Sequence, residues 1–333
     1  MAPGFQTTPR PLRIVIPGGS GLIGNLLAAH FQRAGHHVAV LTRSPYAATW
    51  QTVHWDGETA GDWVQHLEGA DVCINLAGRS VNCRYHARNR EGIYNSRIHS
   101  TRLLGRVIAS LAHPPALWLN ASTATIYRHS LDREMDESGE LGATENTPGT
   151  PRIPSTWRFS HRVAREWEQV FFAAETPRTR KVALRAAILF AATPGSPFDI
   201  LSRLVRLGLG GTQGSGHQFV SWMHETDFLR AVDFIVTHHK LDGPVNLASP
   251  YPLPNREFMS ALREAWRVPN GLPAPALLLE LAALILRTES ELVLKSRCVI
   301  PGKLLDAGFA FEFPYWPEAA ADLVRLWRQR QRS

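Results

Sequence analysis

The chain has 333 residues, of which 44% are hydrophobic and 20% are charged, and its formal net charge is +7. A chain of this length and composition can bury one large core or two modest ones, which excludes a disordered polymer and a disulfide-rich miniprotein. The positive charge is carried almost entirely by arginine, because the sequence contains only four lysines, namely Lys181, Lys240, Lys295 and Lys303.

The predicted elements alternate between strands and helices along the chain. Apolar runs predict strands at 12–17, 37–41, 71–76, 116–121 and 181–190, and helical patterns predict helices at 22–34, 95–111, 157–174, 256–266 and 277–286. Strands that alternate with helices of ten or more residues are typical of βαβ units. We therefore predict an α/β fold, a Rossmann doubly wound parallel sheet with a smaller C-terminal α/β substrate domain.

Composition suggests where the domains divide. We predict a flexible N-terminal extension at 1–11, a nucleotide-binding Rossmann domain at 12–190 to which 217–247 returns, and a mainly C-terminal substrate-binding domain at 191–330. The stretch 138–155 is rich in Gly, Thr and Pro and predicts a long surface loop, a kind of segment that often binds ligands.

Compartment and partners follow from the same reading. The three cysteines form no CxxC pair, which indicates a reducing compartment and no zinc ribbon. The first residues lack the apolar core of a signal peptide, and no apolar run reaches the ~20 residues of a membrane span. The basic tail accompanies no nucleic-acid motif and fits a solvated helix end. We expect a cytoplasmic protein with a small-molecule substrate, no membrane, no nucleic acid and no metal.

A glycine-rich loop joins the first predicted strand to the first predicted helix. It satisfies both GxxGxxG and GxGxxG, and its residues are Gly18, Gly19, Ser20, Gly21, Leu22, Ile23 and Gly24. In this context the glycines permit a tight turn, let the backbone approach a pyrophosphate and allow the helix to pack closely on the strand. The N–H groups at the start of the helix would hold the anion. The loop predicts a dinucleotide site.

The end of the second strand indicates which dinucleotide binds. An acidic residue there would bind the ribose hydroxyls of NAD, but the sequence has Thr42, Arg43 and Ser44, and its first acidic residue is Asp56. The planar fork of Arg43 suits the 2′-phosphate of NADP. The predicted cofactor is therefore NADP(H), with Arg43 as the residue that reads the phosphate.

The order of these motifs resembles that of the short-chain dehydrogenase/reductase superfamily, in its extended epimerase/dehydratase-like branch. More narrowly, the chain looks like the atypical NADP-binding group of epimerase family proteins. The glycine loop is followed by matching stretches at 75–78, 95–102, 123–127 and 185–189, and the narrower group is indicated by 208–218, 221–227 and 296–309.

The resemblance implies roles for several residues. Leu76, Ala77 and Gly78 would pass close to the adenosine and diphosphate, Arg97 would contact the cofactor, and the backbone of Ile188 would approach the nicotinamide. Thr123 matches the catalytic Ser or Thr of the superfamily. His224 and Asp227 match a Trp-x-His-x-x-Asp stretch, and we expect them to be structural, with the histidine bonded to a carbonyl and the aspartate capping a helix.

The main departure from the superfamily is the absence of its Tyr-x-x-x-Lys pair, in which the lysine lowers the pKa of the tyrosine that donates a proton. No tyrosine of this chain is followed by lysine four residues later. Where the pair is expected, one register offers Trp157 and His161 and another offers Ser160 and Ala164. Tyr127 could replace the donor or pack as an aromatic side chain. His161 could shuttle a proton near neutral pH, but we expect it to lie on the helix surface.

Two functions are compatible with these residues. The first is an NADP(H)-dependent oxidoreductase or epimerase-like enzyme for an unknown small polar substrate, with Thr123 and Tyr127 polarising the substrate oxygen. The second is a non-catalytic NADP(H) sensor that keeps the cofactor site without the pair. The apolar helix at 277–286 could line the pocket, fill the C-terminal core or join two chains in a homodimer.

Overall fold

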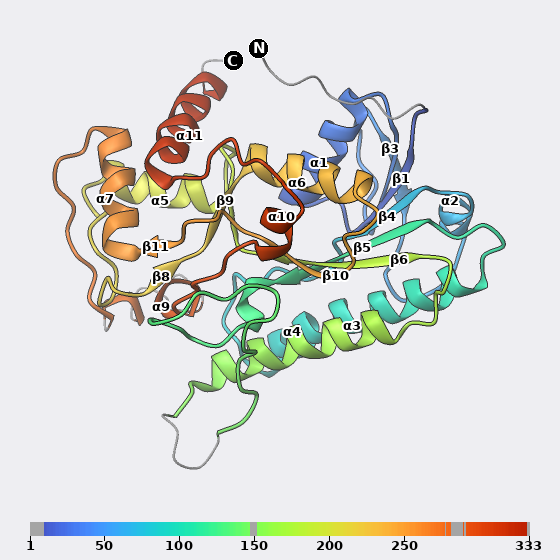
Figure 1. Ribbon diagram of the computed structural model, residues 1–333, viewed down its shortest axis with the longest axis horizontal. Coiled ribbons are helices and arrows are strands. Elements are labelled where there is room, and N and C mark those ends of the chain that lie inside the picture. Colours follow the sequence, from blue (N-terminus) through green and yellow to red (C-terminus); the bar gives the residue numbers. More distant parts are fainter. Residues whose placement is uncertain (1–9, 147–151, 277, 281–288, 290, 332–333) are drawn as a thin grey trace. The chain divides into compact units, whose positions relative to one another are not determined.

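The computed structural model describes residues 10–146, 152–276, 278–280, 289 and 291–331. Its main sheet has seven parallel strands in the order β10-β6-β5-β4-β1-β2-β3, with helices between them (Figure 1). The predicted fold class is therefore confirmed. The strands of this sheet are β1 (Arg13–Pro17), β2 (His37–Thr42), β3 (Gln51–His54), β4 (Val72–Asn75), β5 (Leu117–Thr123), β6 (Arg180–Ala186) and β10 (Gly243–Leu247).

The order of the sheet strands creates a switch point between β1 and β4. From β1 the chain runs outward through β2 to β3, and then returns to place β4 on the other side of β1. Ligands of doubly wound folds bind outside the carboxyl ends of the strands at such a point. The glycine loop follows β1 directly, so it lies at the edge where a ligand is expected.

Helices occur along the whole described part of the chain. They are α1 (Leu22–Arg33), α2 (Val64–Leu67), α3 (Ala87–Ser110), α4 (Ser155–Ala173), α5 (Pro197–Arg206), α6 (Glu225–Thr237), α7 (Asn255–Trp266), α9 (Glu291–Leu294), α10 (Gly302–Asp306) and α11 (Trp316–Arg330), with a 3₁₀ turn η1 (Ala124–Ile126). No helix among the described residues combines the length and the apolar character needed to cross a lipid bilayer.

Most predicted elements lie within a few residues of the observed ones, with two differences. The strand predicted at 181–190 is broken, because Ala187 separates β6 from β7 (Ile188–Phe190), and β7 pairs with β9 (Trp222–His224) outside the main sheet. The helix predicted at 95–111 begins earlier, at Ala87. The remaining strands, β8 (Phe219–Val220) and β11 (Leu253–Pro254), form a separate antiparallel pair. Most of the helix predicted at 277–286 falls outside the described residues.

The chain divides into two compact units. The first comprises Met1–Arg79, Tyr94–Ala121 and Trp167–Ala183, and the second comprises Ser80–Ile93, Ser122–Glu166 and Leu184–Ser333. The core of the first unit gathers around Trp118 and Phe171, whose rings meet edge to face with centroids 4.7 Å apart. Such aromatic pairs add stability beyond the area they bury.

A polar contact within the first unit ties residues of α3 and α4 to the sheet. The Thr101 hydroxyl, on α3, accepts a hydrogen bond from the Trp167 indole, on α4, at 2.8 Å, and another from Asn75 at 3.2 Å. Asn75 ends β4 and is fully buried. The bonds give each of these buried polar groups a partner, which offsets the cost of removing them from water.

The core of the second unit is aromatic. Trp222, Phe258 and Trp316 come from β9, α7 and α11, and the ring of Trp316 stacks on that of Phe258 with centroids 4.0 Å apart. Because α11 supplies Trp316, Leu323 and other buried residues, the end of the chain is part of this core rather than an appendage. The described arginines of the basic tail, Arg325, Arg328 and Arg330, lie at the end of α11, as the sequence predicts.

Candidate functional site

The glycine loop has the geometry that the sequence predicts for a phosphate cradle. Gly18 has a φ of +74°, and a Cβ there would lie 2.5 Å from the Cα of Ala77. A Cβ on Gly24 would lie 2.2 Å from the carbonyl oxygen of Gly19, so a side chain there would separate α1 from the loop. These two glycines are required by close approach of backbone to backbone.

Gly21 differs from its neighbours because it faces open space. A Cβ at Gly21 would meet no protein atom within 4 Å. Gly21 is also the N-cap of α1, where no side chain caps the helix and no acidic residue lies in the first turn. The first N–H groups of the helix and its positive end are therefore available to an anion.

The residues predicted to surround the adenosine lie in the first unit, as does the glycine loop. Thr42 is buried at the end of β2, and Arg43 and Ser44 follow it with exposed side chains. Leu76 and Ala77 continue from β4, where the Asn75 amide oxygen accepts a hydrogen bond from the Ala77 N–H at 3.1 Å. Asn75 therefore shapes the backbone of this turn.

Arg97 lies beside Gly78. Its guanidinium donates to the carbonyl oxygen of Arg79 at 3.0 Å and lies over the ring of Trp167, 5.1 Å from the centroid. A Cβ at Gly78 would come within 3.1 Å of the guanidinium carbon. The structure thus brings Arg97 to the turn predicted to contact the cofactor, and glycine at 78 leaves room for it.

The residues predicted to serve the nicotinamide belong to the second unit. Thr123 is the last residue of β5 and the N-cap of η1, where its hydroxyl oxygen accepts a hydrogen bond from the N–H of Thr125 at 3.1 Å. Ile188 begins β7, and its N–H donates to the carbonyl oxygen of Ser221 at 3.3 Å. Thr123 retains its hydroxyl proton for a ligand, since the capping contact uses the oxygen as an acceptor.

Tyr127 is placed differently from the prediction that it polarises a substrate. Its side chain is 1% exposed, and its hydroxyl donates to the amide oxygen of Asn246 and accepts from Arg185, both at 2.8 Å. Burial raises the pKa of the phenol to about 12. Both hydrogen-bonding functions of the hydroxyl are occupied inside the protein, so this placement favours the packed aromatic over the proton donor.

The expectation that His161 lies on the helix surface is wrong. His161 is 2% exposed, and its Nε2 lies 2.5 Å from the Nζ of Lys295. The nearby Ser160 hydroxyl donates to the Glu291 carboxylate at 2.6 Å. Of the residues at the expected dyad positions, Trp157 stacks on His129 with ring centroids 5.3 Å apart, and Ala164 is buried.

Sequence reasoning missed Lys295, Glu291 and Arg297, which are all buried in the second unit. The only local signal is a lysine and an arginine placed between apolar residues at 292–294 and 298–300. Their partners lie more than a hundred residues away along the chain, so no periodicity could identify them.

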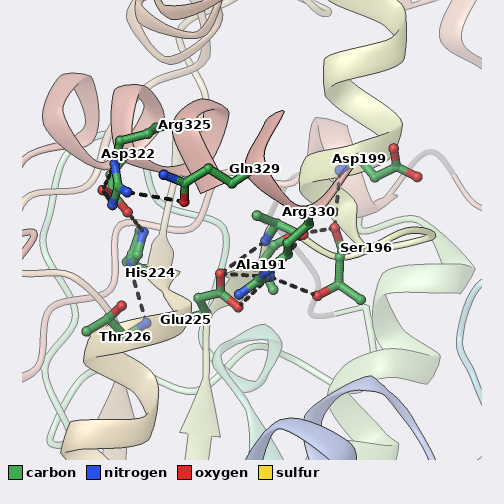
Figure 2. Close-up of polar contacts among 12 residues, drawn as sticks. Ala191, Ser196, Asp199, His224, Glu225, Thr226, Asp322, Arg325, Gln329 and Arg330 are labelled. Carbon is green, nitrogen blue, oxygen red and sulfur yellow. Dashed lines mark hydrogen bonds and ion pairs between the residues drawn. The ribbon is translucent and has the colours of Figure 1, made fainter. Parts of the chain in front are cut away.

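His224 and Asp227 have structural roles, although not the bonds that were expected. His224 is itself the N-cap of α6, and its Nδ1 accepts a hydrogen bond from the N–H of Thr226 at 3.1 Å (Figure 2). Asp227 accepts from the N–H groups of Glu312 and Phe313, each at 2.8 Å. Asp227 therefore fastens the loop before α11 instead of capping a helix.

The same region joins α11 to α6 and to the loop between β7 and α5 through charged groups. The guanidinium of Arg330 donates to the carbonyl oxygen of Ala192 at 2.9 Å and pairs with Glu225 at 3.2 Å (Figure 2). The Nε2 of His224 lies 3.5 Å from a carboxylate oxygen of Asp322. Burial nevertheless lowers the pKa of His224 to about 4, against the opposing effect of Asp322.

The buried imidazole of His224 predicts a pH dependence of stability. Between about pH 6.5 and about pH 4 the unfolded state binds a proton at this position and the folded state does not, so stability falls as the pH falls through that window. The expected contribution is about 3 kcal/mol at its largest. His224→Asn keeps a good N-cap, and its free energy of unfolding should depend less on pH than that of the wild type.

Chemical denaturation at pH 7 and pH 4.5 measures this difference. Since the carboxyl groups are the same in both proteins, comparing wild type with His224→Asn isolates the histidine. Equal losses of stability in the two proteins would show that His224 does not titrate in this way.

A pocket of about 450 Å³ lies in the second unit. Apart from Glu134 its lining is apolar or aromatic, and it includes Tyr251 and Tyr315, whose rings are parallel with centroids 4.7 Å apart. None of the residues predicted to bind the cofactor or to act on the substrate lines this pocket. Among the described residues, no three His, Cys, Asp or Glu side chains gather as a metal ion would require.

Comparison with known proteins decides the family. The model of the NAD dependent epimerase/dehydratase family matches residues 14–248, and the model of a domain of unknown function, DUF1731, matches residues 274–323. The chain belongs to the NAD dependent epimerase/dehydratase family. The extended short-chain dehydrogenase resemblance noted in the sequence is thereby confirmed.

Relatives within this epimerase/dehydratase family align along most of their length. The epimerase family protein YfhF of Bacillus subtilis is 29% identical, with 94% of this chain and 98% of YfhF covered. An epimerase family protein of Staphylococcus epidermidis, SERP0438, is 28% identical over 94% of this chain and 99% of its own. The crystal structure of human epimerase family protein SDR39U1 with NADPH superposes with a TM-score of 0.81 at 25% identity, covering 94% and 99% of the two chains.

Proposed function

We propose that the protein binds NADP(H) and acts as an oxidoreductase or epimerase-like enzyme on a small polar substrate. The observation that carries the proposal is the open N-terminus of α1 at Gly21, with the exposed Arg43 following the neighbouring strand β2. The human relative was crystallised with NADPH, which supports the choice of cofactor.

The residues of the first unit fit the two charged parts of the cofactor. The N–H groups at the start of α1 suit a pyrophosphate, because they point out of the helix end. Gly21 has no side chain that would block an anion from reaching them. Arg43 suits the 2′-phosphate as a bidentate donor. Leu76, Ala77 and Gly78 form the neighbouring turn after β4, and Arg97 of α3 lies beside Gly78.

The chemistry that bound NADP(H) supplies is hydride transfer. Within this proposal the Thr123 hydroxyl donates a hydrogen bond to the substrate oxygen, since its own oxygen already accepts from the N–H of Thr125. The backbone of Ile188, at the start of β7, would approach the nicotinamide. Tyr127 is left out of the catalytic group because its hydroxyl is occupied by Asn246 and Arg185.

A second function, a non-catalytic NADP(H) sensor, is favoured because the polar side chains that could act as proton donors are buried. Tyr127, His161 and Lys295 are the groups that could replace the missing Tyr-x-x-x-Lys pair, and each is at most 2% exposed. A sensor would need only a change of shape between its NADP-bound and free states.

Binding measurements with NADP, NADPH, NAD and NADH, followed by a screen of carbonyl and sugar-nucleotide substrates monitored by nicotinamide absorbance, test both functions. We expect NADPH to bind more tightly than NADH, and Thr123→Val to abolish the turnover that the screen finds. Tight NADPH binding without turnover of any substrate would favour the sensor. Turnover that persists in Thr123→Val would contradict the role given to that hydroxyl.

A further inference from the structure

Lys295 is a buried cation with two partners from distant parts of the second unit. It lies within the segment that matches DUF1731 and is 1% exposed. Its Nζ donates to the carbonyl oxygen of Thr125 at 2.6 Å and lies 2.5 Å from the Nε2 of His161. An ammonium that is buried without good partners is costly, so these contacts determine where Lys295 can lie.

The surroundings of His161 define the direction of the second contact. The Nδ1 of His161 lies 2.9 Å from the carbonyl oxygen of Ala143, which can only accept, so Nδ1 carries the proton. Nε2 is then the acceptor and Lys295 the donor. Burial, with a further effect of Lys295, lowers the pKa of His161 to about 4, which keeps the ring neutral near pH 7.

Glycine at position 142 lets the ring of His161 occupy this place. A Cβ there would lie 2.2 Å from the Cε1 of His161, and the N–H of Gly142 donates to the carbonyl oxygen of Ile126 at 2.8 Å. The loop that carries Gly142 and Ala143 therefore closes over the imidazole. Lys295 and His161 are 1% and 2% exposed, so protein encloses this pair.

The carbonyl that Lys295 holds belongs to the turn that starts at Thr123. Thr125 is in the middle of η1, and its N–H donates to the hydroxyl oxygen of Thr123. Arg297 supplies a second bond to this turn, from its Nε to the Thr125 hydroxyl oxygen at 3.2 Å. Two cations of the C-terminal segment thus bind the same residue of η1.

A carboxylate accompanies these cations. Glu291, four residues before Lys295, accepts from the Ser160 hydroxyl of α4. Burial and Arg297 lower the pKa of Lys295 below its ordinary value, whereas Glu291 acts in the opposite direction. Burying such charged groups costs desolvation free energy that their mutual attraction often only offsets, so the cluster is weak evidence of added stability. We interpret it as a means of fixing the positions of the neighbouring groups.

We propose that Lys295 is a positioning residue, which holds η1 against α4 through Thr125 and His161 and thereby sets the direction of the Thr123 hydroxyl. This inference rests on the proposed function, in which Thr123 serves the nicotinamide end of NADPH. We do not give Lys295 the role of the lysine of the missing pair, because its ammonium is buried and contacts Thr125 and His161.

The test compares Lys295→Met with Lys303→Met. Lys303 is the matched control, since its Nζ also donates to a backbone carbonyl, that of Asp242, but at an exposed position. We expect Lys295→Met to weaken NADPH binding about tenfold and to change the fluorescence of bound NADPH as Thr123→Val does. Affinity for 2′,5′-ADP, which lacks the nicotinamide, should stay within about twofold of the wild type, and Lys303→Met should leave both ligands unaffected.

A second pair of variants keeps Lys295 in place. His161→Gln offers an amide oxygen as acceptor and should retain the NADPH fluorescence of the wild type, whereas His161→Leu should behave as Lys295→Met does. If Lys295→Met fails to fold, these two His161 variants still test whether Lys295 positions η1.

The outcomes separate this inference from the proposed function. Wild-type NADPH fluorescence and affinity in Lys295→Met, or equal behaviour of His161→Gln and His161→Leu, would overturn the positioning role while NADPH binding stands. Failure of the wild type to bind both NADPH and 2′,5′-ADP would overturn the proposed function, and the inference with it.

Discussion

Gly21→Val is expected to abolish NADPH binding while leaving the fold intact. A Cβ at this position would have no atom within 4 Å apart from nearby backbone of its own chain segment, so the valine side chain would displace a pyrophosphate without a clash with the rest of the protein. We expect affinity to fall at least about a hundredfold, equivalent to about 2.7 kcal/mol. Isothermal titration with NADPH, together with thermal unfolding of the free protein, measures both effects.

Gly61→Val is the matched control for this variant. Gly61 is exposed in the same unit, has no positive φ, and a Cβ there would make only an ordinary contact with Trp63 at 3.7 Å. Its affinity for NADPH should equal that of the wild type. Unchanged NADPH binding in Gly21→Val would mean that the glycine loop does not hold the cofactor.

Arg43→Ala is expected to remove the preference for NADPH over NADH. A hydrogen bond to a charged group contributes about 1.5–3 kcal/mol, so the loss of the guanidinium should weaken NADPH binding between about tenfold and about a hundredfold. NADH affinity should hardly change, because NADH has no 2′-phosphate. Titration of both dinucleotides against wild type and variant gives the ratio of the affinities.

The control for Arg43→Ala is Arg33→Ala. Arg33 is an exposed arginine in the last turn of α1, at the opposite end from the glycine loop, and its Nε donates to the carbonyl oxygen of Ala29. An equal loss of NADPH affinity in both variants would indicate a general effect of charge. A loss for NADH as large as that for NADPH would show that Arg43 does not read the 2′-phosphate.

The parts of the fold that could be predicted from sequence are those with local causes. The strand before Gly18, the glycine turn and α1 follow one another within 20 residues or so of chain, and each carries its own signal in apolar runs and glycine spacing. Arg43 could be singled out because the absence of an acidic residue before Asp56 is a property of the sequence alone.

The parts that could not be predicted depend on distant segments. The break after β6 arises because Ile188 pairs with β9, which comes more than 30 residues later. His161 has the polar neighbours of a surface residue, but it is buried by Lys295, 134 positions away. Tyr127 finds Asn246, 119 positions away, in the same manner. Helical periodicity reports none of these pairings.

The bonds of Lys295 and Arg297 to Thr125 also have a consequence for synthesis and turnover of the chain. Residues 122–166 are made long before the segment that carries the two cations, so η1 acquires its final partners only after Lys295 and Arg297 have been synthesised. A protease that cuts before Lys295 would leave the glycine loop and β1 to β5 in the remaining chain, but would remove both cations from the turn. Loss of the C-terminal segment would then disturb Thr123, which is expected to face the substrate. It would leave in place the glycine loop and Arg43, which are expected to hold the phosphates.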